Sequence, residues 1–389
     1  MMTEQQAVST QSQPETNAIF RLLFVDNWRM AMMILVVVHH VAVVYQASTP
    51  FYYLEPPSRQ DPLGFLTLLI FLLVNQSWFM GAFFLISGYF TPKAFDSKGS
   101  GSFLKDRLLR LGIPLVIFIF VLNPICYIGV YQMPAYLGGI TTPFTWQQYP
   151  KTMGPGILWF VEMLLIFDFG YVAWRLLTKN RRWQGSAGSQ PPGYLAIGIF
   201  ILALALVTYL LRGVMPMGKS TPVLNFPTPG YIPQYLSLFI LGIVANRLNW
   251  FQTIRNSVGW VGFAVAAVAT ILLFPLATGG TWIFLGNFTW QSGVYALWDS
   301  IMGVSMCLGL LVLFRRFFNR QGKLAAFLSL HSYTVFIIHT PVIVFLALAL
   351  RGIDIEHLLK FVMVSIIAVP LCFGVAYLVR KIPYASKIL

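Results

Sequence analysis

Two histidines lie inside long apolar stretches of the sequence, where a side chain that can take up a proton is unusual. His40 belongs to the stretch 27–46 and His339 to the stretch 326–350. Each lies about thirteen residues from the start of its stretch, so helices in both places would hold the two imidazoles at a similar depth. An imidazole titrates near neutral pH and can remove the proton of a hydroxyl group. The pair therefore indicates general-base chemistry, with a purely structural hydrogen bond between helices as the alternative.

Two carboxylates extend this set of titratable groups. Glu162 and Asp299 lie within about nine residues of the start of apolar stretches that run in the opposite direction. All four side chains are then expected in one layer, in the outer half of a membrane. Ionisable groups at that depth are costly and mark functional sites by default, although each could also tie two helices together. His39 is expected about 100° around the helix from His40, in a structural role.

A second set of polar residues belongs to the opposite membrane face. Arg29 precedes His40 by eleven residues, which places it on the same helix face and about 16 Å away. Ser87 lies near the end of the second apolar stretch, and Arg107 and Arg110 are three residues apart on one helix face, a spacing that suits a forked grip on a phosphate. The alternatives are a snorkelling flank residue for Arg29, close helix packing at Ser87, and ordinary cytoplasmic loop charge for Arg107 and Arg110.

The composition decides which kind of fold must position these residues. The 389 residues are 57% hydrophobic and only 10% charged, which excludes an ordinary soluble domain, since soluble chains carry about 25% charged residues. The net charge of +14 is typical of the basic cytoplasmic loops of a membrane protein, so no nucleic-acid partner is expected. Cys126, Cys307 and Cys372 lack metal-ligand spacing, and neither a disulfide framework nor a metal site is expected.

The apolar residues gather into ten stretches long enough to cross about 30 Å of hydrocarbon. They predict an all-α integral membrane protein, a bundle of about ten transmembrane helices that forms a single domain over residues 21–389. Residues 1–20 are polar and are expected to form a disordered cytoplasmic tail rather than a signal peptide. The stretches are 27–46, 64–92, 111–132, 156–178, 193–211, 231–249, 257–276, 290–314, 326–350 and 358–379.

The distribution of basic residues predicts the orientation of the bundle. Of the 26 Lys and Arg residues, eighteen lie in 93–110, 175–182, 247–255, 315–323 and 380–387, on one side of the predicted membrane. Six lie on the other side, namely Arg59, Lys151, Arg212, Lys219, Arg351 and Lys360. Because cytoplasmic loops carry the excess of positive charge, both termini are expected in the cytoplasm.

Several segments of the sequence resemble the acyltransferase-3 family of integral-membrane acyltransferases. FVDNWRMAMMILVVVHH resembles the opening of that family, FFLISGYF its Phe-x-x-Ser-Gly segment and FLKDRLLRLGIP its Arg-x-x-Arg-Leu continuation. GILWFVEMLLIF, YLSLFILGIVA and SYTVFIIHTPV resemble later blocks, so that the resemblance covers residues 20–385 in the right order. The tail VRKIPYASKIL is similar to that of the glucan biosynthesis protein C-like subgroup.

The resemblance implies a function and assigns roles. It implies transfer of an acyl group from cytoplasmic acyl-CoA, such as acetyl-CoA or succinyl-CoA, to a hydroxyl of a carbohydrate at the outer face of the cell (inner or plasma) membrane. An example would be O-acetylation of a polysaccharide or another glycan. His40 matches the essential histidine of such relatives, and Arg29 matches an arginine that supports donor binding.

Combined with the two layers of polar residues, this predicts that Arg29, Ser87, Arg107 and Arg110 bind the donor. His40 would be the catalytic base or carry a transient acyl group, with Glu162, Asp299 and His339 completing the catalytic set. The main alternative is a transporter or lipid flippase that uses the buried charges as a proton relay. An acyl phosphate or a lipid-linked donor in place of acyl-CoA is a third possibility.

Overall fold

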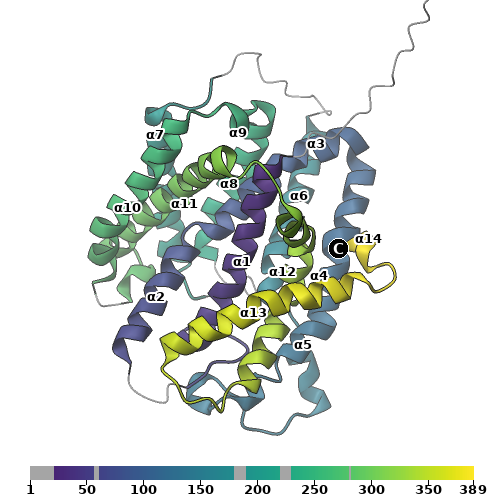
Figure 1. Cartoon of the computed structure of the whole chain (residues 1–389). Helices are drawn as coiled ribbons and strands as arrows, with labels where there is room; N and C mark the ends of the chain where they lie inside the picture. The colour runs from purple at the N-terminus through teal and green to yellow at the C-terminus, as the bar shows by residue number, and fades with distance from the viewer. Residues whose placement is uncertain (1–21, 57–60, 179–189, 220–228, 280–281) are drawn as a thin grey trace, which may run out of the picture.

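The computed structural model describes residues 22–56, 61–178, 190–219, 229–279 and 282–389. These residues form helices and no strand, which confirms the all-α prediction for this part of the chain (Figure 1). The predicted tail 1–20 lies outside the described residues. The α-helices are α1 (Leu23–Gln46), α2 (Pro62–Gln76), α3 (Phe79–Arg107), α4 (Ile113–Ile117), α5 (Asn123–Cys126), α6 (Trp159–Leu177), α7 (Tyr194–Val214), α8 (Ile232–Arg247), α9 (Trp250–Thr253), α10 (Asn256–Thr278), α11 (Trp290–Phe317), α12 (Lys323–Ala349), α13 (His357–Arg380) and α14 (Ala385–Ile388).

Eight of the described segments are long and apolar enough to cross a membrane. Seven of them contain one long helix each, whereas the segment 62–132 contains two of the predicted stretches. Helix α8 has 16 residues, which is shorter than a usual membrane span of about 20. The fold is thus that of a multi-pass helical membrane protein, and the count of ten spans stays a prediction.

The second predicted stretch, 64–92, is not one helix but is divided between α2 and α3. The hydroxyl of Ser77 donates to the carbonyl of Val74 at 2.7 Å, and the helix stops there. The carbonyl of Ser77 instead accepts a hydrogen bond from Nε2 of Gln234 in α8 at 2.7 Å. Because a partner from a distant helix satisfies this carbonyl, the chain can break inside an apolar run, where a free backbone group would be costly.

The third stretch is interrupted by two prolines. Wide π-turns at Leu108–Gly112 and Phe118–Leu122 precede Pro114 and Pro124, which lack the N–H group that would bond the carbonyls of Arg110 and Phe120. Tyrosine hydroxyls replace the missing donors, since Tyr333 donates to the carbonyl of Arg110 and Tyr149 donates to that of Phe120, both at 2.5 Å. The segment therefore remains helical as far as Cys126, and turns of 3₁₀-helix follow it.

Helix α1 lies in the middle of the bundle, where it contacts α2, α3, α11, α12 and α13 (Figure 1). Most of its residues are buried, whereas α7, α10 and α13 present many large apolar side chains to the outside. Such faces suit contact with lipid. The helix that carries His40 is therefore surrounded by protein rather than by the bilayer.

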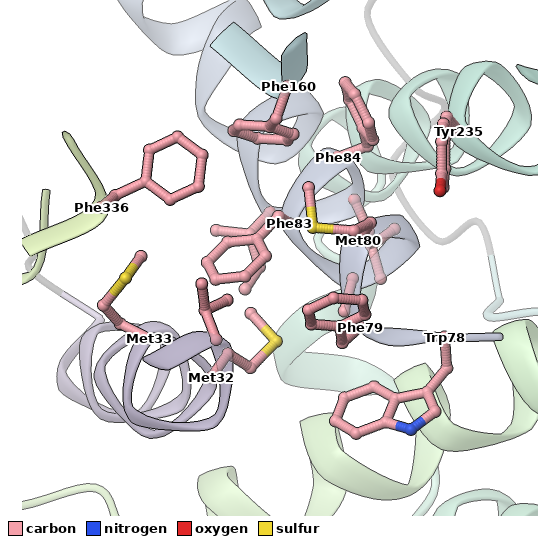
Figure 2. Packing of buried hydrophobic residues seen from close by; sticks show 14 of the residues in the cluster. Met32, Met33, Trp78, Phe79, Met80, Phe83, Phe84, Phe160, Tyr235 and Phe336 are labelled. Carbon is pink, nitrogen blue, oxygen red and sulfur yellow. The ribbon is translucent and has the colours of Figure 1, made fainter. Parts of the chain in front are cut away.

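Aromatic and methionine side chains fill the space between the helices that carry the candidate site. In Figure 2, Met32 of α1 points toward Phe79 and Phe83 of α3, and Met33 points toward Phe336 of α12. Phe84 continues this cluster, because its ring lies 4.6 Å from that of Phe160 in α6 and 5.0 Å from that of Tyr235 in α8. Large aromatic side chains bury much apolar surface in defined geometries, so this cluster fixes α1, α3, α6 and α8 relative to one another.

The predicted orientation leads to a direct test. Two of the six basic residues assigned to the outer side, Arg212 and Lys360, are buried in ion pairs and are not loop charges, which increases the charge asymmetry. A reporter fused after Leu389 or inserted at Arg181 is expected to read cytoplasmic, and one at Lys219 to read extracytoplasmic. An extracytoplasmic C-terminus in such a fusion series would contradict the orientation.

Candidate active site

The start of α1 is held in register with α12 by a polar side chain. Asn27 donates from Nδ2 to the carbonyls of Phe318 and Arg320, at 2.7 and 2.9 Å, and its Oδ1 accepts from Gln321 at 3.0 Å. These bonds tie α1 to the connection between α11 and α12. Helices α1 and α12 also pack against each other. His40, which lies more than three turns after Asn27 on α1, is therefore placed opposite a defined position of α12.

That register brings His40 and His339 together. Nδ1 of His40 lies 3.3 Å from Nε2 of His339, and the ring centroids are 4.8 Å apart. His339 is fully buried and His40 is half-buried. The two histidines expected at one depth are thus in direct contact.

The backbone around the two rings determines where their protons lie. Nδ1 of His40 is 2.8 Å from the carbonyl of Val36, and Nδ1 of His339 is 2.8 Å from that of Phe336. A carbonyl oxygen can only accept, so in the neutral state each Nδ1 carries the proton. The single N–H at Nδ1 of His40 is then shared between the carbonyl of Val36 and Nε2 of His339, and Nε2 of His40 keeps its lone pair. This hydrogen-bond pattern makes Nε2 of His40 the nitrogen that can take up a proton.

His40 lines an open cavity of about 760 Å³ formed by α1, the segment 47–54 and the turns between residues 123 and 159. Aromatic and polar side chains gather in its wall, among them Tyr52, Tyr127, Tyr136 and Trp159. Among the described residues that line it, Lys151 is the only Lys, Arg, Asp or Glu. The cavity therefore suits a ligand that combines flat apolar faces with hydroxyl groups, and it favours a negative charge over a positive one.

One wall of this cavity is fixed by a chain of hydrogen bonds. The hydroxyl of Tyr52 donates to Oδ1 of Asn123, whose Nδ2 donates to the carbonyl of Thr152 at 2.5 Å. Gly156 packs against both side chains at a φ of 47°, and a methyl group at this position would overlap the tyrosine hydroxyl. Only glycine combines this left-handed backbone with the close approach. The loops that close the cavity are thus positioned by specific contacts.

His39 does not face away from the site, as its position on the helix had predicted. Its ring packs on Phe79 at 4.9 Å, but it also lines the same cavity as His40. The two rings touch edge to face at 5.5 Å. The prediction was wrong because two neighbouring side chains, although about 100° apart around the helix, can both reach a cavity as wide as this one.

The two carboxylates assigned to the catalytic layer lie elsewhere. Asp299 of α11 forms a fully buried ion pair with Arg212 of α7 and lies 3.4 Å from Nε2 of Gln234. Glu162 of α6 is half-buried, and its Oε2 has no hydrogen-bond partner among the described residues. Neither carboxylate belongs to the described lining of the histidine cavity. Their catalytic roles stay predictions, and the geometry gives Asp299 a structural partner.

Comparison with known proteins assigns the chain to a family. The family described as "Acyltransferase domain", Acyl_transf_3, matches residues 22–380, nearly the whole chain. The chain belongs to this acyltransferase family. Proteins named "Glucans biosynthesis protein C" from Salmonella paratyphi B and Salmonella heidelberg are each 24% identical to it over 339 residues, which cover 84% of this chain and 83% of the relative. No solved structure matches.

The acyltransferase carries the arginines predicted to bind the donor at the other end of α1 and α3. Nε of Arg107 is 3.0 Å from Oδ2 of Asp168 in α6, and the carboxyl group of Asp168 is buried. Arg110 is exposed. The side chain of Arg29 is 43% exposed and lies 3.3 Å from Asp26. Arg107 is therefore held by a carboxylate of the protein, whereas the guanidinium groups of Arg29 and Arg110 are accessible.

Ser87 lies where α3 and α8 cross. Its carbonyl accepts from the hydroxyl of Thr91 at 2.9 Å. The neighbouring Gly88 packs directly on the backbone of Phe239, and Gly242 of α8 packs on the backbone of Leu85, so a methyl group at either glycine would overlap a carbonyl oxygen. These contacts support close helix packing as the role of this segment, and a role of Ser87 in donor binding stays a prediction.

The ion pairs that anchor this acyltransferase were missed in the sequence. Arg212 had been assigned to a loop, and its contact with Asp299 joins residues 87 positions apart. Asp96 of α3 binds both Arg175 of α6 and Arg247 of α8, at 2.8 and 2.5 Å. One signal was present, because an isolated Asp or Arg in an apolar run requires a partner of opposite charge. The sequence does not say which partner.

Proposed function

We propose that this acyltransferase moves an acyl group from cytoplasmic acyl-CoA to a hydroxyl of a carbohydrate at the outer face, with His40 as the general base. The observation that carries the proposal is the hydrogen-bond pattern of the His40–His339 pair, which leaves Nε2 of His40 as a proton acceptor at a wide, polar and aromatic cavity. A general base must lie beside the hydroxyl from which it takes the proton. The cavity is large enough to bring a sugar hydroxyl to that position.

In the proposed transfer, the acyl group moves from the CoA sulfur to the acceptor oxygen, and the hydroxyl proton moves to the CoA sulfur. Nε2 of His40 takes the proton of the acceptor hydroxyl while its oxygen attacks the carbonyl carbon of the thioester. The carbon–sulfur bond then breaks, and the leaving sulfur of CoA receives the proton from the imidazolium. His339 is a positioning residue, because its Nε2 accepts from Nδ1 of His40 and stabilises the charged ring. In a covalent route, Nε2 of His40 would also be the atom that carries the acyl group.

A carbohydrate acceptor fits the chemistry of the cavity wall. Tyr127, Tyr136 and Trp159 offer aromatic faces, and the polar side chains of Tyr52 and Asn123 also line the cavity. The relatives' name refers to glucan biosynthesis, which points to a glucan or similar glycan as the acceptor class. Lys151 would favour an acceptor or an acyl group that carries a negative charge.

The first experiment uses purified protein in nanodiscs with acetyl-CoA or succinyl-CoA and a linear glucose oligosaccharide. We expect mass spectrometry to detect acylated oligosaccharide, and its formation should depend strictly on acyl-CoA. Translocation of a glycan or lipid without acyl-CoA, in the absence of any acylated product, would instead support a transporter or flippase. Acylation from an acyl phosphate or a lipid-linked donor alone would overturn the assignment of the donor.

Replacement of the exposed Arg110 tests whether this residue binds acyl-CoA. Arg110→Gln is expected to raise the apparent Michaelis constant for acyl-CoA about tenfold, because a charge-assisted contact to a phosphate is worth about 1.5 kcal/mol or more. The maximal rate should fall much less, since a contact kept in the transition state mostly affects the Michaelis constant. The measurement is the initial rate across donor concentrations.

The matched control for this test is Arg255→Gln, which removes an exposed arginine from another loop predicted on the same side. It should leave the donor constant unchanged. Arg107→Gln is less informative, because it also leaves the buried Asp168 without its ion-pair partner. If Arg110→Gln lowers only the maximal rate, Arg110 does not bind the donor.

A further inference from the structure

A second cavity of about 320 Å³ lies beside the histidine-lined cavity at the predicted outer face. Glu55, Gln132, Arg351, Asp354 and His357 contribute polar groups to its wall. Four of these residues come from three connecting segments, namely the one after α1, the turns after α5 and the α12–α13 connection, and His357 is the first residue of α13. Neither the proposed transfer nor the donor end uses this cavity.

One extended segment separates the two cavities. Tyr52 and Leu54 line the histidine cavity, whereas the intervening Tyr53 and the following Glu55 line the second cavity. This alternation is that of an extended chain, whose successive side chains point to opposite sides. The N–H of Leu54 donates to Sδ of Met133 at 2.8 Å, which joins the segment to the turns after α5. The two cavities thus lie back to back and share a wall one chain thick.

The second cavity holds a buried carboxylate that is only partly satisfied. Oε1 of Glu55 accepts from Nζ of Lys360, and both side chains are buried. Oε2 of Glu55 is buried without a hydrogen-bond partner among the described residues. A buried polar atom of this kind costs free energy unless a ligand or water satisfies it.

The other groups at the second cavity supply both donors and acceptors. Arg351 donates to Oε1 of Gln132 at 3.0 Å and has further N–H groups to offer. Nδ1 of His357 is 2.9 Å from the carbonyl of Tyr45, so its Nε2 is left as an acceptor. Asp354 is exposed and adds a carboxylate.

The formal charges around this cavity cancel, and that selects the class of ligand. Glu55 pairs with Lys360, and Arg351 is matched by Asp354, so no net charge favours an anion or a cation. Among the described residues, no three His, Cys, Asp or Glu side chains gather to bind a metal ion. Carboxylates, a guanidinium group, an amide and an imidazole in a neutral cavity suit a ligand with many hydroxyl groups, which both donate and accept.

We infer that the second cavity is a subsite for a further sugar unit of a carbohydrate acceptor whose reacting unit lies in the histidine-lined cavity. The inference rests on the proposed function for the position of the reacting unit. It assigns the acceptor as an oligosaccharide or longer glycan rather than a single sugar. Glu55, Arg351 and Asp354 are the residues that recognise the additional unit.

The test compares a linear glucose oligosaccharide with glucose as acceptors of the full-length protein in nanodiscs. The variant Arg351→Ala/Asp354→Ala removes one donor and one acceptor group and keeps the net charge. We expect its apparent constant for the oligosaccharide to rise about tenfold or more, with the constants for glucose and for acyl-CoA unchanged. Lys219→Gln, which changes an exposed charge outside both cavities, is the matched control and should alter neither constant.

A second readout separates the subsite from the proposed transfer. Calorimetric titration of the oligosaccharide into the His40→Ala protein measures binding without turnover, and the added Arg351→Ala/Asp354→Ala changes should weaken that binding by the same factor. An unchanged constant for the oligosaccharide, or an equal change for glucose, overturns the subsite while leaving the transfer intact. If the added changes weaken oligosaccharide binding but the wild-type protein transfers no acyl group, the proposed function is overturned and the subsite is kept. Absence of oligosaccharide binding in both readouts overturns the subsite.

Discussion

His40→Ala is expected to lower the rate of acyl transfer by about a hundredfold to ten-thousandfold, the usual contribution of a general base. The physical reason is that Nε2 of His40 is the nitrogen that the surrounding hydrogen bonds leave free to take the proton. The donor contacts predicted for α1 and α3 lie at the other end of the bundle, so the binding of acyl-CoA should change little. The measurement is the initial rate at saturating donor, with acyl-CoA binding determined separately.

The control for this loss is His331→Ala. His331 is a buried histidine of α12 with the same contact to the backbone, because its Nδ1 lies 2.7 Å from the carbonyl of Phe327, and it does not belong to the described lining of the histidine cavity. It should retain near wild-type activity per folded molecule, as judged by thermal unfolding. A His40→Ala rate within about threefold of wild type would remove His40 from the mechanism.

Asp299→Asn is expected to lower the free energy of unfolding by about 3–5 kcal/mol, because it leaves the guanidinium group of Arg212 buried without a counter-ion. Arg212 also lies over the rings of Tyr231 and Tyr295, at 4.6 and 5.6 Å from their centroids, and has no access to water. The measurement is unfolding in detergent or nanodiscs, compared with wild type under identical conditions.

The double variant Arg212→Met/Asp299→Leu distinguishes the ion pair from other roles of Asp299. Replacing both charged partners by apolar side chains of similar size should recover much of the stability lost in the single variant. The sequence alone predicted a catalytic role for Asp299, which would lower the maximal rate and spare donor affinity. An Asp299→Asn protein of wild-type stability with a reduced maximal rate would contradict the structural assignment and support the catalytic one.

The sequence predicted that the two histidines of the site share one depth, because depth in a membrane can be counted along a helix. His40 and His339 lie equally far from the starts of two helices that are predicted to run in the same direction. Their partners could not be found in the same way. Asp299, which starts from the opposite side, was placed in the same layer by count, but depth does not say which helices are neighbours. Only the packing of α11 against α7 places Asp299 beside Arg212.

The helix breaks also depend on contacts between distant segments, which an apolar pattern does not reveal. The apolar run 64–92 gives no sign of the break at Ser77, which is stabilised by Gln234 from 157 positions further along the chain. Pro114 and Pro124 do indicate disturbed helix, but not the tyrosine hydroxyls that satisfy the freed carbonyls. Both cavities are closed by connecting segments without periodicity, such as 47–56 and the turns after α5, so neither could be outlined from the sequence.

The most direct test of the account is the sidedness of the reaction in proteoliposomes of known orientation. Radiolabelled acetyl-CoA or succinyl-CoA is enclosed on the side that carries Arg110, and a linear glucose oligosaccharide is supplied on the side that carries Lys219. We expect labelled oligosaccharide on the Lys219 side, and none when His40→Ala protein is used. Label that appears only when donor and acceptor share one side, or no label with either acyl-CoA, would contradict transfer across the membrane at His40.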